Sequence, residues 1–145
     1  MNANDEQKAI RKWAMLCHLS SIFCMILFSP FLSILGPLCV WQLKKNLDPA
    51  IDSHGKESLN FQITLFIYVI IISIIFVLVA SVSCGLGAAS NSALSVMVTA
   101  GIILFIGVVV IQIMEIAAFI LVIFAAIKAS KGEFYRYPFT IRFLK

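Results

Sequence analysis

Long runs of apolar residues, interrupted by polar ones at only a few points, dominate the pattern along this 145-residue chain. Four apolar stretches can be distinguished, at 13–28, 31–43, 61–82 and 96–127. A helix needs about 20 apolar residues to cross the hydrocarbon core of a bilayer. The third stretch meets this length. The fourth would be ~48 Å long, so one of its ends should project into water. The pattern predicts an all-α integral membrane protein with four hydrophobic helices.

Neither of the first two stretches reaches the spanning length. They could form one broken helix that crosses once, or a hairpin that enters the membrane and returns. Pro30 lies between them, and Pro37 interrupts the second, where a missing backbone donor should kink the helix. We expect a short helical hairpin over 13–43, turned at Pro30, with arms that form a shallow wedge in the membrane.

The distribution of basic residues favours the hairpin over the single crossing. All 11 lysines and arginines lie before residue 13, between 44 and 60, or after 127, and none lies between 83 and 95. A hairpin places them all on one side, which the positive-inside rule makes the cytoplasm. We therefore expect a multi-pass membrane protein with both termini cytoplasmic. Its parts would be a cytoplasmic loop (44–60), transmembrane helices (61–82 and 96–127), an outer loop (83–95) and a basic aromatic cytoplasmic tail (128–145), all in a single membrane domain (1–145).

Composition supports the membrane location and argues against a soluble enzyme. Hydrophobic residues make up 61% of the chain and charged residues 12%, against about 45–50% and 25% in soluble domains. The N-terminal segment lacks the pattern of a cleavable signal peptide and is expected to remain. The four cysteines form no CxxC pair, and the two histidines are far apart. We therefore expect buried thiols, no metal site and no cofactor.

Polar residues gather at the end of the predicted cytoplasmic loop. Asp52 or Ser53 can cap a helix that begins near His54. Asp52, His54 and Glu57 could form a metal or acid–base site, but one histidine with two carboxylates and no nucleophile is a poor match to either. We favour a capped and salt-bridged turn at the membrane interface, with no catalytic residues.

Several motifs resemble a known family. They are AMLCHLS at 14–20, GPLCVW at 36–41 followed by two lysines, DSHGKESLNFQ at 52–62 and IKASKGEFYRYPFTIR at 127–142. The chain resembles small bacterial membrane proteins that are similar to the Tic-twenty subunit of the chloroplast inner-envelope protein translocon. The resemblance implies four membrane helices with cytoplasmic termini, in the bacterial inner (plasma) membrane. It says little about activity. The candidate interaction residues within these motifs are Asp52, His54, Lys56, Glu57, Asn60, Gln62, Tyr135, Arg136 and Tyr137.

Glu115 and Gln112 interrupt the apolar fourth stretch. A carboxylate there costs at least ~2.5 kcal/mol, and lipid offers it no hydrogen-bond partner. We therefore expect Glu115 to face the helix bundle, closer to Gln112 or Ser73 than to His18, which lies at a shallower depth and matches Tyr68. Glu115 could be a proton or cation site, as in a small transporter or channel. We favour a neutral, hydrogen-bonded structural carboxyl group.

The tail mixes five basic residues with aromatic ones. Nucleic-acid binding would need a basic surface away from the membrane. Here the segment directly follows a membrane helix, where anionic lipid attracts each lysine or arginine by ~1 kcal/mol. We expect an anchor to anionic lipid at the cytoplasmic face and no nucleic acid. The sequence thus predicts a non-enzymatic membrane protein that acts through protein partners or as a homo-oligomer, as an accessory of protein translocation or membrane organisation. The alternative function is a proton- or cation-coupled transporter or channel that uses Glu115.

Overall fold

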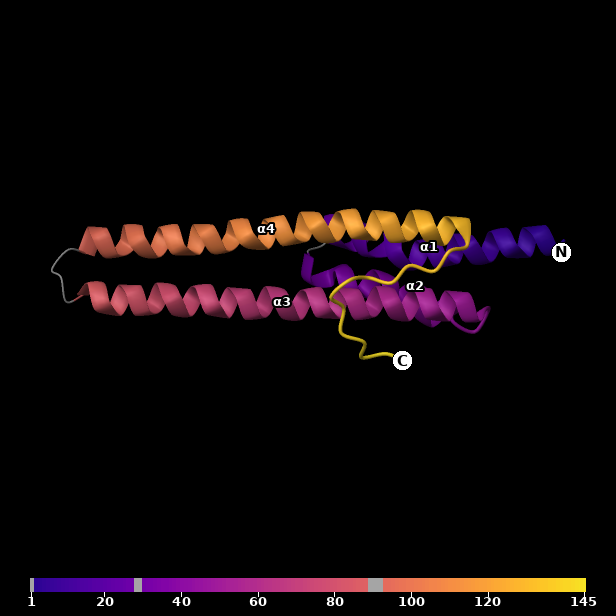
Figure 1. Cartoon of the computed structure of the whole chain (residues 1–145), viewed down its shortest axis with the longest axis horizontal. Helices are drawn as coiled ribbons and strands as arrows, with labels where there is room; N and C mark the ends of the chain where they lie inside the picture. Colours follow the sequence, from indigo (N-terminus) through magenta and orange to yellow (C-terminus); the bar gives the residue numbers. More distant parts are fainter. Residues whose placement is uncertain (1, 28–29, 89–92) are drawn as a thin grey trace. The chain divides into compact units, whose positions relative to one another are not determined.

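The computed structural model describes residues 2–27, 30–88 and 93–145, and these contain helices and no strand. Along the chain they form α1 (Ala3–Leu27), the short 3-10 helix η1 (Pro30–Ile34), α2 (Leu35–Lys44), α3 (Pro49–Ala88) and α4 (Ala93–Lys131), followed by an extended tail (Figure 1). Three of them, α1, α3 and α4, are long and apolar enough to cross a membrane. The ten residues of α2 reach only ~15 Å. The all-α class is confirmed.

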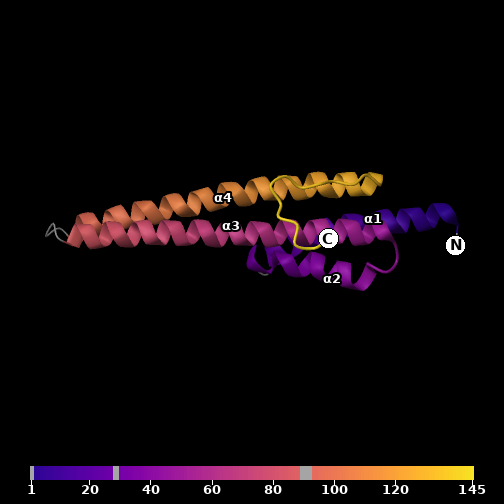
Figure 2. The ribbon, with the colours of Figure 1, turned by 60° about the horizontal axis from the view of Figure 1, so that its bottom comes forward.

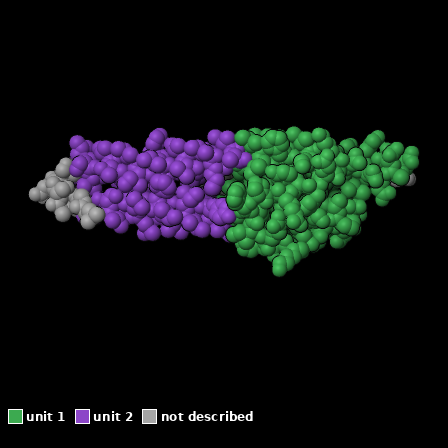
Figure 3. Space-filling model, in the orientation of Figure 1, with its two compact units in different colours: residues 1–66, 118–145 green, residues 67–117 purple. Residues whose placement is uncertain are grey.

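The chain divides into two compact units, which are described separately (Figure 3). Unit 1 comprises residues 1–66 and 118–145, and unit 2 comprises residues 67–117. Helices α3 and α4 run through both units, so the two units are not separate segments of the chain. The single membrane domain expected from the sequence stays a prediction. Every buried polar side chain of the described residues belongs to unit 1. A functional site built from buried polar groups must therefore be sought there.

Within unit 1, α1 and α2 run in opposite directions and pack against each other (Figures 1 and 2). Gly36 permits this close approach, because a Cβ atom there would overlap the backbone carbonyl oxygen of Ser20. Pro37 lies in the first turn of α2, where backbone N–H groups have no partner in the helix. It therefore fits the start of α2. The arm expected over 31–43 changes here from η1 to α2, and the kink expected at Pro37 stays a prediction. The described chain does not continue as one helix through 13–43, and residues 28–29 of the turn lie outside it.

The two tryptophans mark where the polar ends of α1 and α2 meet. Lys44 at the end of α2 places its Nζ 4.4 Å from the ring centroid of Trp13 in α1. Lys45 lies over the ring of Trp41 in the same way, at 4.8 Å. Both indoles are therefore on the side of unit 1 where the basic residues gather, as expected for an interfacial belt.

The segment expected to be a loop over 44–60 is mostly helical. Asp48 caps α3 by accepting a hydrogen bond through its Oδ1 from the backbone N–H of Ala50 at 2.7 Å. Pro49 occupies the first helical position, where its missing N–H costs nothing. The cap expected at Asp52 or Ser53 is therefore wrong, because the helix begins one turn earlier. The connection between α2 and α3 spans only residues 45–48.

Helices α3 and α4 also extend beyond the membrane segments expected at 61–82 and 96–127. Most of the predicted outer loop over 83–95 is helical, and residues 89–92 lie outside the described chain. Each helix has about 40 residues and would measure ~60 Å, twice the thickness of the hydrocarbon core. Helical hydrogen bonding can continue where the apolar run stops, so we expect the ends of both helices to project into water.

Thiol labelling on intact cells tests the predicted topology. Cys84 is exposed near the end of α3, on the side expected to be outside. A membrane-impermeant thiol reagent should label it in intact cells, and Cys84→Ser should abolish that signal. In the Cys84→Ser background, a cysteine placed at the exposed Ser53 should react only after the membrane is opened. Equal labelling of residue 53 in intact cells would contradict the topology.

Candidate functional site

Four buried polar side chains recur along one face of α3. His54, Glu57, Asn60 and Thr64 are separated by three or four residues, which places them on the same side of a helix. We call these four residues the polar stripe. Each of them binds a group that is distant in the sequence, so the polar stripe attaches both α1 and the tail to α3.

Asn60 and Thr64 bind the backbone of the tail. Asn60 Oδ1 accepts hydrogen bonds from the N–H groups of Phe143 at 3.0 Å and Leu144 at 2.9 Å, while its Nδ2 donates to the carbonyl of Leu144 at 2.9 Å. Thr64 Oγ1 accepts a hydrogen bond from the N–H of Ile141 at 3.0 Å. The side-chain amide of Asn60 thus hydrogen-bonds the peptide groups of the tail through both its donor and its acceptor, as a neighbouring β-strand would. It holds the tail independently of the tail side chains.

Glu57 adds a charged contact to the same segment. Its Oε1 accepts a hydrogen bond from the N–H of Tyr137 at 2.9 Å and lies 3.6 Å from the guanidinium of Arg142. The Glu57 side chain is only 6% exposed, whereas that of Arg142 is 45% exposed. A buried carboxylate is costly unless it is paired and hydrogen-bonded. The tail supplies both partners, so Glu57 and the tail stabilise each other.

His54 connects α3 to α1, and through α1 to the tail. His18 Nε2 lies 3.1 Å from His54 Nδ1, and the hydroxyl of Tyr137 lies 3.0 Å from His18 Nδ1. Both ring nitrogens of His18 are therefore occupied, one by α3 and the other by the tail. A hydrogen bond between two ring nitrogens requires that one of them carries no proton. The three rings thus form a hydrogen-bonded chain that can run in either direction.

The ring of Tyr137 fills the centre of this site. It stacks on Phe61 with 4.0 Å between ring centroids, in a buried cluster that includes Val122 and Ala125 of α4. Burial raises the pKa of the Tyr137 hydroxyl well above its usual value, and the neighbouring Tyr135 and Glu57 raise it further. The hydroxyl therefore keeps its proton and remains available for hydrogen bonding to His18.

Other predicted residues attach the α1–α2 hairpin to α3. Trp41 Nε1 donates a hydrogen bond to Asp52 Oδ1 at 2.8 Å, and Lys56 pairs with Asp52 at 2.7 Å one turn later. Gln62 Oε1 accepts a hydrogen bond from the hydroxyl of Ser33 in η1 at 3.0 Å. Asp52 thus binds α2 and Lys56, and Gln62 binds η1. These three polar residues of α3 surround the polar stripe.

Two predicted tail residues lie at the edge of the site. The ring of Tyr135 meets that of Tyr137 edge-on at a centroid distance of 5.3 Å, and Lys128 Nζ lies 5.8 Å from the Tyr135 ring. Arg136, between the two tyrosines, is exposed. The structure therefore brings all the candidates from the sequence motifs to one region except for the outward-facing Arg136 side chain.

Glu115 and Gln112 lie elsewhere, in unit 2. Glu115 is partly buried, Gln112 is exposed, and Ser73 donates its hydroxyl hydrogen bond to the carbonyl of Val69 in its own helix. Within the described residues, no hydrogen bond joins Glu115 to Gln112 or Ser73. The structural role expected for Glu115 therefore stays a prediction.

Sequence reasoning did not assign His18 and Thr64 to the site. The spacing of Thr64 from Glu57 and Asn60 could have revealed it as the next polar residue on the same helix face. His18 offers no such signal, because its partner His54 lies 36 residues away on another helix. Its role becomes visible only once the hairpin is packed against α3.

The polar stripe is suited to holding the tail. Across the described chain, no group of three or more histidine, cysteine, aspartate or glutamate side chains is placed to hold a metal ion. Among the same residues, no buried side-chain nitrogen or oxygen lacks a hydrogen-bond partner. The polar atoms of the polar stripe are therefore engaged in joining α1, α3 and the tail.

Comparison with known proteins identifies the family. The model of the MamF/MmsF family, described as the magnetosome magnetite crystal formation protein family, matches residues 9–144. This match overturns the Tic-twenty-like assignment: the motif residues that suggested it are those that attach the hairpin and the tail to α3. No curated protein and no solved structure is detectably similar to the chain. Since the match covers nearly the whole sequence, the chain belongs to the magnetosome magnetite crystal formation protein family.

Proposed function

We propose that this chain is a non-enzymatic membrane-organising protein that acts through protein partners, which bind the outward side of its tail. The supporting observation is that residues of the polar stripe bind the backbone of the tail. Glu57, Asn60 and Thr64 hold the backbone of the tail. This leaves the side chains of Arg136, Phe139 and Phe143 exposed. The family description gives magnetite crystal formation as the process that this organisation would serve. The protein would lie in the bacterial inner membrane or a membrane derived from it, with both termini in the cytoplasm.

The turn at Pro138 and Phe139 is the part of the tail best suited to a partner. Phe139 has a φ of 56°, a left-handed conformation that costs a residue other than glycine about 1–2 kcal/mol. Its side chain is 89% exposed, and Arg136 and Arg142 lie within three residues of it. Aromatic and arginine side chains contribute most to binding at protein interfaces. The strained backbone thus presents an aromatic ring to the surroundings, as a docking residue requires.

Photo-crosslinking in native membranes tests this function. A benzophenone amino acid at Phe139 should give discrete adducts with protein partners, which mass spectrometry can identify. The same substitution at Phe105, which is 68% exposed in unit 2, should give lipid adducts because it lies in the apolar part of α4. Lipid adducts alone at both positions would refute a partner-binding tail.

Glu115 supports a second candidate, a proton- or cation-coupled transporter. Its carboxyl group lies in the apolar part of α4 without a hydrogen bond to Gln112 or Ser73, and such groups often mark ion pathways. If Glu115 is structural, Glu115→Gln should preserve folding and leave ion flux at the level of protein-free liposomes, as for the wild type. A pH-dependent flux in wild-type liposomes that a stably folded Glu115→Gln protein lacks would favour the transporter instead.

A further inference from the structure

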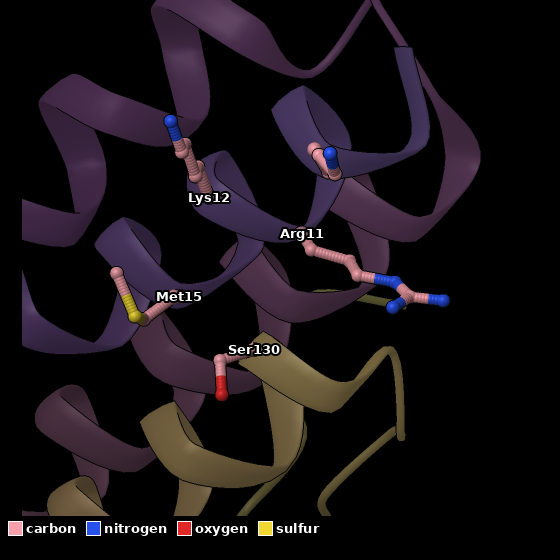
Figure 4. Close-up of a pocket in the computed structure, with 5 residues that line it drawn as sticks. Arg11, Lys12, Met15 and Ser130 are labelled. Carbon is pink, nitrogen blue, oxygen red and sulfur yellow. The ribbon is translucent and has the colours of Figure 1, made fainter. Parts of the chain in front are cut away.

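A basic pocket lies outside the polar stripe, between the first half of α1 and the last turn of α4, both in unit 1 (Figure 4). Its volume is about 220 Å³. Lys8, Arg11, Lys12 and Met15 contribute from α1, where intervals of three and four residues place them on one helix face. Ser130 contributes from α4.

The charge of this pocket is not neutralised by the protein. Three cationic side chains line it, and no acidic side chain does. The ion pairs of the described chain involve other residues, although Asp5 and Glu6 stand nearby in the first turn of α1. Positive charge concentrated in this way attracts anions.

The side chain of Arg11 lies next to the end of α4 at the rim of the pocket. Gly132 ends α4 with a φ of 81°, and its N–H donates to the carbonyl of Ala129 at 3.0 Å, as in a left-handed helix cap. A Cβ atom on Gly132 would lie 3.0 Å from Arg11 Nε. The guanidinium therefore packs directly on the glycine.

We propose that this pocket binds the phosphate group of an anionic ligand, either a phospholipid headgroup or a free phosphate. A guanidinium presents paired donors that match phosphate oxygens, and Lys8 and Lys12 add compact positive charges. Met15 continues the pocket toward the apolar part of α1, where the chain of a lipid would lie. Binding of a lipid headgroup rests on the proposed membrane location, whereas binding of free phosphate does not. Apart from Ser130, the pocket lies outside segment 128–145, where the sequence led us to expect the contact with anionic lipid.

A pair of matched double variants tests this site. Lys8→Gln with Lys12→Gln removes two charges from the pocket. Arg136→Gln with Lys145→Gln removes the same charge from exposed positions of the tail. Full-length proteins in phosphatidylcholine nanodiscs with a small fraction of phosphatidylglycerol would be analysed by native mass spectrometry. The pocket variant should lose affinity for phosphatidylglycerol by about fivefold for each lysine and about 25-fold in total, and more than the tail variant does.

A second measurement identifies the source of the phosphate. Inorganic phosphate would be titrated by calorimetry into the proteins in pure phosphatidylcholine nanodiscs. Binding of phosphatidylglycerol alone identifies a lipid headgroup site. Binding of inorganic phosphate to the wild type but not to the pocket variant identifies a free phosphate site. The proposal would be overturned if the pocket and tail variants lost equal affinity for phosphatidylglycerol. It would also be overturned if the wild type and the pocket variant bound each of the two ligands equally well. Since neither readout involves a protein partner, the site and the proposed function can fail independently.

Discussion

Gly36→Ala should destabilise the α1–α2 hairpin by about 2–3 kcal/mol, even though alanine favours helix by about 1 kcal/mol over glycine. The reason is that the new methyl group would overlap the carbonyl oxygen of Ser20, a backbone atom that cannot rotate away. The two helices would have to separate, which would weaken the packing along the hairpin. Unfolding in mixed micelles, followed by circular dichroism, measures the loss.

Gly101→Ala is the matched control for this substitution. Gly101 lies within α4, and a Cβ atom there would meet nothing within 4 Å. This variant should be unchanged or stabilised by up to about 1 kcal/mol, because only helix propensity acts. Equal stability changes for the two glycine variants would show that Gly36 does not set the approach of α1 to α2.

Asn60→Leu should detach the end of the tail from α3 while the helices stay folded. Leucine has a similar size but would leave three backbone groups of Phe143 and Leu144 without their partner. At about 0.5–1.5 kcal/mol for each hydrogen bond, the attachment should weaken by about 2–4 kcal/mol. Trypsin cleavage after Arg142 should then be about 30-fold faster or more, since it requires the tail to be released.

Two further variants make this result specific. Asn60→Asp keeps an acceptor for both N–H groups, but it turns an oxygen toward the carbonyl of Leu144 and adds a buried negative charge near Glu57. Its cleavage should therefore also be faster than that of the wild type. Asn46→Leu changes an exposed asparagine in the connection between α2 and α3 and should have no effect. Identical cleavage rates for Asn60→Leu and Asn46→Leu would mean that Asn60 does not hold the tail.

The sequence reveals the membrane helices because lipid imposes a simple requirement. Any segment that crosses must be apolar over about 20 residues and internally hydrogen-bonded, so α3 and α4 stand out. The start of α3 was missed for a local reason. The charged residues after Pro49 suggest a loop, whereas Asp48 already caps a helix whose buried face is polar.

The attachment of the tail could not be predicted from the sequence. Glu57 and Tyr137 are 80 residues apart, and no periodicity links them. Asn60 and Thr64 bind backbone N–H groups, which every residue except proline has. Their contacts therefore require no particular residue types in the tail. The motifs did indicate the residues concerned, from Asp52 to Gln62 and around Tyr137, but could not show that they bind one another.

Hydrogen exchange of the tail amides tests most directly whether the polar stripe holds the tail against α3. The N–H groups of Tyr137, Ile141, Phe143 and Leu144 donate to Glu57, Thr64 and Asn60. In the full-length protein in nanodiscs these four amides should exchange much more slowly than those of an unstructured peptide, and Asn60→Leu should remove the protection of Phe143 and Leu144. Exchange of all four amides at the rate of an unstructured peptide in the wild-type protein would contradict the attachment of the tail.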